Sequence, residues 1–169
     1  MMANLRRVLI LLVALGIGGM IGQAQTMGGE TRPGEWMRDW LVCGPFPLAT
    51  LPNNTPDGEH IPGFERDYLA AVGGEARPQV RAGDEVRHAG GAARWVAHTT
   101  TGFAVNLDQV VTDQAFVLAY AYREIEWPRD ETMVLALGSN DGGRAWLNGE
   151  EIWDRPEARG LKVDDELLR

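Results

Sequence analysis

The stretch Gly138–Trp153, "GSNDGGRAWLNGEEIW", carries two turn signals and decides the fold. Asp141-Gly142 and Asn148-Gly149 lie seven positions apart, and a tryptophan stands on either side of the second pair. Asn-Gly favours a two-residue type I′ turn, because both residues tolerate the positive φ that its two central positions need. The sequence therefore predicts a tight β-hairpin closed by Asn148 and Gly149.

The period of two along a strand sorts the side chains of this hairpin onto two faces. One face is apolar and belongs on the core, and it carries Ala145, Leu147 and Ile152. The other face is amphipathic and carries Arg144, Trp146, Glu151 and Trp153. On this second face we expect Arg144 to lie opposite Trp153 and to stack over its indole, and we expect Arg144 to pair with Glu151.

Two main interpretations of the amphipathic face stay open. In one it is an ordinary, partly covered outer surface, since large aromatic side chains commonly pack. In the other it is a carbohydrate site: a sugar ring stacks on indole while Arg144 and Glu151 bond its hydroxyl groups. Contact with another protein is a third interpretation. The predicted ligand-binding residues are Arg144, Trp146, Glu151 and Trp153.

The segment 115–125, "AFVLAYAYREI", predicts the central strand of the fold. Its alternation places large side chains on one face (Phe116, Leu118, Tyr120, Tyr122) and small ones on the other (Val117, Ala119, Ala121). Because both faces are apolar, this strand should be covered on both sides.

Further strands are predicted at 36–47, 94–100, 103–107 and 132–139, with one short helix at 64–72. The helix rests on Phe64, Tyr68 and Val72 at four-residue spacing, followed by two glycines. Residues 48–63 and 75–93 are rich in turn residues and predict loops. Many short strands without alternating helices predict an all-β fold, an antiparallel β-sandwich or jelly roll.

Residues 1–24 have the pattern of a secretory signal peptide. Arg6 and Arg7 precede an apolar run from Val8 to Ile21, and Gly22-Gln23-Ala24 offers small residues for cleavage. An uncleaved membrane anchor is the alternative, although the run is short for a membrane span. We therefore expect a secreted or periplasmic protein, with a flexible lead-in at 25–35 and one domain at 36–169.

The charge balance argues against nucleic acid and anionic lipid as partners, whose phosphates would be repelled. The chain has 16 basic and 24 acidic residues. Removing residues 1–24 takes away two arginines and no acid, so the remainder is 14 − 24 = −10. A neutral ligand such as a carbohydrate suits this charge, and no membrane contact is expected beyond the signal peptide.

The residues suitable for catalysis or metal binding form no convincing pattern. Cys43 is the single cysteine, so no internal disulfide can form, and its apolar neighbours predict a buried, inert thiol. The three histidines share no metal-ligand spacing. We expect no enzyme, no cofactor and no metal. A structural calcium ion on Asn140, Asp141 and the acidic run 164–166 is the weaker alternative to a solvated acidic turn.

The hairpin resembles the core hairpin of galactose-binding-like jelly rolls, similar to the sugar-binding N-terminal domain of family-two glycoside hydrolases. The resemblance rests on "GSNDGGRAWLNGEEIW", on "AYAYREI" before it, and on the opening "WLVCGPFP", and it extends in patches over residues 36–169. It implies a β-sandwich accessory module of an exported carbohydrate-active or cell-surface protein. It implies no catalysis by this domain. A structural or protein–protein interaction module without a sugar ligand is the alternative.

One departure from that family concerns the C-terminal end. The family pattern continues after the hairpin through an acidic turn into further strands, whereas this sequence ends at "DDELLR". A strand without its pairing partner would leave an exposed edge. We therefore expect a C-terminally incomplete sandwich: the N-terminal part of a longer protein with a downstream domain as partner, or a truncated reading frame.

Overall fold

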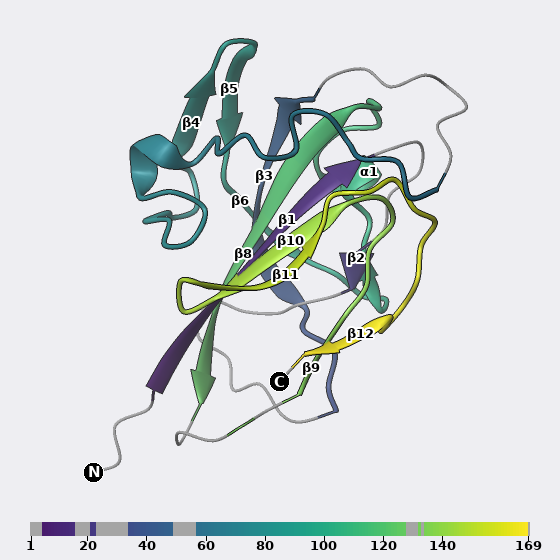
Figure 1. Ribbon diagram of the computed structural model, residues 1–169. Coiled ribbons are helices and arrows are strands. Elements are labelled where there is room, and N and C mark those ends of the chain that lie inside the picture. The colour runs from purple at the N-terminus through teal and green to yellow at the C-terminus, as the bar shows by residue number, and fades with distance from the viewer. Residues whose placement is uncertain are drawn as a thin grey trace.

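The computed structural model describes residues 5–15, 21–22, 34–48, 57–127, 132 and 134–168. Within them the chain is mostly β-strand in antiparallel sheets, as predicted. The largest sheet has six strands in the order β11–β10–β1–β8–β3–β6 (Figure 1). In that order its strands are Glu150–Arg155, Gly143–Leu147, Leu5–Leu15, Val117–Trp127, Asp39–Pro47 and Val96–Thr99.

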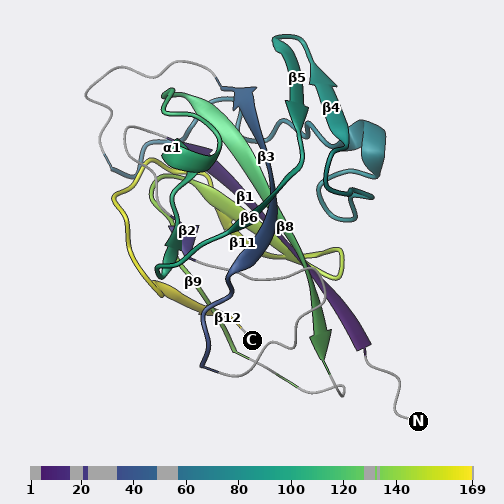
Figure 2. The same cartoon turned by 180° about the vertical axis from the view of Figure 1, so that it is seen from behind.

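Three two-stranded sheets and two short helices surround the large sheet. The small sheets pair β12 (Glu166–Leu168) with β9 (Leu135–Leu137), β2 (Ile21–Gly22) with β7 (Ala104–Val105), and β4 (Glu85–His88) with β5 (Gly91–Arg94). The helices are α1 (Leu107–Val110) and a 3₁₀ turn at Ala70–Val72. Figures 1 and 2 show the β4–β5 hairpin and the β9–β12 pair at opposite sides of the molecule.

Strand β8 divides the apolar interior into two cores, one on each face of the large sheet. Val117, Ala119 and Ala121 belong to a core shared with α1, β7 and β9. Leu118, Tyr120 and Tyr122 belong to the other core, which the segment around 61–69 and the β4–β5 hairpin cover. The prediction of a central strand covered on both sides is confirmed, because alternation along β8 sends small side chains one way and large ones the other.

Three local predictions were wrong. The strand predicted at 103–107 is only the two-residue β7, and Leu107 begins helix α1. Residues 64–72 form turns with a 3₁₀ helix only at Ala70–Val72, although Phe64 and Tyr68 of the predicted helix face are buried. Residues 75–93, predicted as loop, contain strand β4 and most of β5. Within that hairpin only the side chains of Val86 and Ala93 are buried, and both pack in the core. The other residues are exposed or half-buried, so the polar composition of the segment did not indicate a strand pair.

The segment predicted as the apolar part of a signal peptide lies in the middle of the large sheet. Residues Leu5–Leu15 form β1, which pairs antiparallel with β8 on one side and with β10 on the other. Removal of residues 1–24 stays a prediction. Of the predicted lead-in at 25–35, only residues 34 and 35 are among those described.

Candidate functional site

The predicted hairpin is present and its turn has the expected backbone. Asn148 and Gly149 have φ values of 55° and 87°, the positive values that a type I′ turn requires. Trp146 pairs with Glu151 and Leu147 with Glu150, as the sequence predicts. Beyond these pairs the register shifts, and Ala145 lies opposite Trp153 rather than Ile152.

This shift is a β-bulge, and it corrects the predicted placement of Trp153. Two residues of β11 oppose one residue of β10, so the side chains beyond the bulge change faces relative to strict alternation. Arg144 therefore lies opposite Asp154 and not opposite Trp153. Ile152 and Trp153 both pack with Ala145 in the core that contains α1.

The two hairpin tryptophans consequently do not share a surface. Trp153 is 4% exposed and belongs to one core, whereas Trp146 is 6% exposed and belongs to the other. The Trp153 indole lies against Gly143, where an added Cβ would stand 2.2 Å from the ring. Both indoles are packing residues in this arrangement, and a sugar ring has no access to a joint indole face.

Arg144 is held by acidic and aromatic neighbours on the second face. Its guanidinium bonds both carboxylate oxygens of Asp154 at 3.1 and 3.2 Å and lies 3.7 Å from Glu151. It also lies over the rings of Phe64 (5.3 Å) and Trp146 (5.8 Å). The pair with Glu151 is confirmed, and the stack on Trp153 is replaced by stacks on Phe64 and Trp146. Asp154 was not predicted as a partner, because an unbroken ladder places Trp153 opposite Arg144.

A buried carboxyl group lies close to this cluster. The Tyr120 hydroxyl donates to Glu75 Oε1 at 2.7 Å and accepts from the Tyr68 amide at 3.1 Å. Burial raises the pKa of Glu75 to about 7, the Tyr120 bond and Arg144 oppose that rise, and Asp67 adds to it. Glu75 lies in a segment whose composition predicts a polar loop, and no local pattern indicates that its side chain reaches Tyr120.

A pair of exposed aromatic side chains lies elsewhere, beside strands β3 and β6. Trp36 and Phe103 are 43% and 44% exposed, and their ring centroids are 6.3 Å apart. The Thr100 amide donates to the Arg38 carbonyl at 3.0 Å, which continues the β3–β6 pairing and brings the two rings together. The sequence does not indicate that these two rings are exposed or adjacent, because their proximity depends on the register between β3 and β6.

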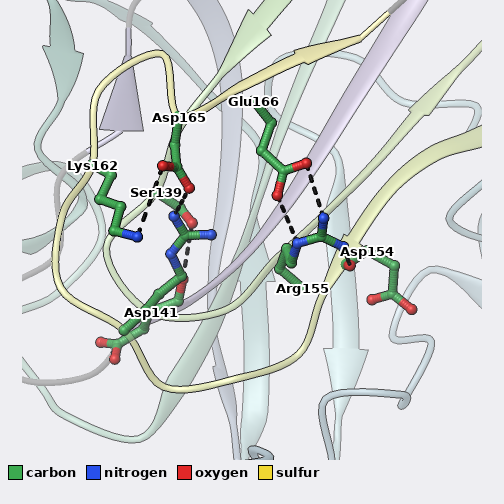
Figure 3. Close-up of polar contacts among 8 residues, drawn as sticks. Ser139, Asp141, Asp154, Arg155, Lys162, Asp165 and Glu166 are labelled. Carbon is green, nitrogen blue, oxygen red and sulfur yellow. Dashed lines mark hydrogen bonds and ion pairs between the residues drawn. The ribbon is translucent and has the colours of Figure 1, made fainter. Parts of the chain in front are cut away.

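Two of the acidic residues considered for calcium, Asp165 and Glu166, pair with arginine and lysine side chains (Figure 3). Arg155 bonds both oxygens of Glu166 at 2.6 and 2.9 Å, and Asp165 pairs with Arg159 and with Lys162. The Arg159 guanidinium lowers the pKa of Asp165. Among the described residues no group of three or more His, Cys, Asp or Glu side chains could hold a metal ion.

Cys43 is fully buried, as predicted, and burial raises the pKa of its thiol to about 12. A thiol with so high a pKa stays protonated near neutral pH and is a poor nucleophile. Cys43 therefore packs in the core opposite Tyr120 of the neighbouring strand β8 rather than contributing a reactive group.

Comparison of the chain with protein-family models, with curated proteins and with solved structures found no match. In the described part of the chain, no helix has the length and hydropathy needed to cross a membrane.

Proposed function

We propose that the protein is a non-catalytic, carbohydrate-binding-like accessory module of an exported protein, with a jelly-roll β-sandwich of galactose-binding-like type. The observation that carries the proposal is the exposed pair Trp36–Phe103. Large aromatic side chains gain much by burial, so two that touch and stay exposed favour a ligand that stacks on them. The hairpin resemblance and the antiparallel sheets with an apolar core on each face support the fold.

The surroundings of the pair favour a neutral sugar over a charged partner. Glu35, Arg38 and Thr101 are exposed and adjoin the two rings along the chain, so they supply donors and acceptors for hydroxyl groups. The acidic balance of residues 25–169 disfavours anionic ligands. Glu75 and Tyr120 are buried and hydrogen-bonded to each other, so we propose no ligand contact for them.

A glycan array with purified protein tests the proposal. Trp36→Ala and Phe103→Ala should each weaken glycan binding about tenfold or more, because stacked aromatic contacts are worth about 1–3 kcal/mol per ring by analogy with base stacking. Leu167→Ala is the matched control, since Leu167 is 68% exposed and lies on β12. If glycan binding survives both ring substitutions but is lost in Glu151→Gln, the ligand binds the predicted hairpin residues and not the Trp36–Phe103 pair.

A structural or protein–protein interaction module is the second candidate, and one observation favours it. Trp146 and Trp153 are buried in separate cores and Arg144 is already paired, so the hairpin offers little for a sugar to stack on. Failure of every glycan to bind the folded protein would favour this candidate. Trp36 and Phe103 would then be tested as a contact with a neighbouring protein.

A further inference from the structure

The six-stranded sheet depends on the N-terminal segment of the chain, because β1 is one of its inner strands. Strand β1 lies between β8 and β10, with register positions from Leu5↔Trp127 to Leu15↔Val117 along β8 and from Leu9↔Leu147 to Val13↔Gly143 along β10. Residues 8–15 of this strand also form the first part of the apolar run, Val8 to Ile21, of the predicted signal peptide. If residues 1–24 are removed on export, β8 and β10 lose the neighbour that they share.

The loss would open a slot inside the sheet rather than at its margin. Strand β8 keeps β3 on its other side, and β10 keeps β11. The facing edges of β8 and β10 would then present unpaired amide and carbonyl groups over the length of a strand, and such edges bind other strands readily.

The walls of this slot define the chemistry of an occupant. On one face they are Tyr120, Tyr122 and Trp146, and on the other Ala119, Ala121 and Ala145. All six side chains belong to the buried cores. An occupant must therefore be extended, and apolar on both faces over the part that lies between these walls, as strands inside a covered sheet are.

We propose that the exported form of the protein has a strand-acceptor site between β8 and β10. The site takes an apolar segment of about ten residues from another polypeptide, antiparallel to both strands, by β-strand addition. Backbone hydrogen bonds to β8 and β10 supply most of the affinity, and the apolar walls exclude charged side chains from the part of the segment that lies between them. The proposal rests on the export proposed above and is independent of sugar binding.

The first measurement establishes whether the slot is vacated. The full chain is produced in an exporting bacterial host, and the intact mass of the exported protein is determined. A mass that lacks residues 1–24 supports the proposal, whereas a mass that retains residues 5–15 in the folded protein overturns it and the predicted cleavage together. A failure of glycan binding alone would leave the strand-acceptor site standing.

The second measurement tests the site with a peptide of known register. The probe is a synthetic peptide of residues 5–15 with lysines at both ends for solubility. It should slow hydrogen exchange of the amides in 117–127 and 143–147 at least tenfold, with a smaller effect in the β4–β5 hairpin. The matched control is the same peptide with Leu9→Pro and Leu11→Pro, which lacks two backbone donors and should not protect.

If the processed protein is insoluble, the same strand can be supplied as a covalent fusion. Residues 5–15 are appended after Arg169 through a flexible Gly/Ser linker, beside a control with the two prolines. The proposal predicts soluble, exchange-protected protein from the fusion with the unchanged strand and not from the fusion with the two prolines. Slow exchange in β8 and β10 of the processed protein without any peptide, or closure of the slot between two copies detected by light scattering, would overturn it.

Discussion

The indole of Trp153 on β11 occupies the space above Gly143 on β10, where a Cβ would lie 2.2 Å from the ring. The bulge opposite Ala145 brings Trp153 to this side of the sheet. Trp153 is 4% exposed and belongs to the buried core that also contains Val42 and Leu107, so its ring has little freedom to move aside. Glycine at position 143 is therefore required for the Trp153 indole to pack in the core.

Gly143→Ala should therefore destabilise the protein by about 3 kcal/mol or more, because extra atoms forced into a packed core displace rigid neighbours. Urea unfolding followed by circular dichroism measures the change. Gly160→Ala is the matched control, since an added Cβ there meets nothing within 4 Å, and its effect should stay below about 0.5 kcal/mol. Equal stability of the two variants would contradict the packing described for Trp153.

The buried carboxyl group of Glu75 should make stability depend on pH in an uncommon direction. Its pKa is raised from 4.5 to about 7, chiefly by burial, so between these pH values the folded protein holds a proton that the unfolded chain has released. Stability from this group is therefore complete at low pH and is lost as the pH rises toward 7, by up to about 3 kcal/mol.

Glu75→Gln keeps an acceptor for the Tyr120 hydroxyl and removes the titration. The variant should gain stability relative to the wild type as the pH rises from 4.5 to 7, measured by urea unfolding at each pH. Glu150→Gln, at an exposed site in the hairpin, should leave the wild-type profile unchanged. Parallel curves for the wild type and Glu75→Gln would refute a raised pKa at this position.

Arg144 links the hairpin to Glu75, and its removal should have two measurable effects. Arg144→Met leaves Asp154 and Glu151 without their cation and should cost about 2 kcal/mol, since a broken pair costs more than a surface pair contributes. It should also move the Glu75-dependent transition to higher pH, because the charge of Arg144 lowers the pKa of Glu75.

Arg155→Met is the matched control for Arg144→Met. Arg155 also pairs with a carboxylate, that of Glu166, but its side chain is 44% exposed, against 14% for Arg144. Its loss should cost less than about 1 kcal/mol and leave the pH transition in place. Unfolding curves of both variants across pH separate the two effects, and an unmoved transition in Arg144→Met would contradict the electrostatic link.

The sequence predicted those features that depend on local pattern. Alternation in 115–125 identified the central strand and its two faces, and the Asn148-Gly149 pair identified the turn. It could not place Trp153, because a bulge adds one residue without any change in local composition. Phe64 and Tyr68 have helical spacing, yet turns bury them equally well. Contacts such as Glu75 with Tyr120 join residues 45 positions apart and depend on the assembled fold.

Tryptophan accessibility tests the reassignment of the candidate ligand surface from the hairpin to the Trp36–Phe103 pair. Trp36 is 43% exposed and Trp153 is 4% exposed. Trp36→Phe should therefore remove much more of the acrylamide-quenchable fluorescence than Trp153→Phe, because a collisional quencher must reach the indole. Both variants retain the other tryptophans, so their contribution cancels in the comparison. A larger loss in Trp153→Phe, with the far-ultraviolet circular dichroism unchanged, would place the hairpin indole at the surface and restore the amphipathic face expected from strict alternation.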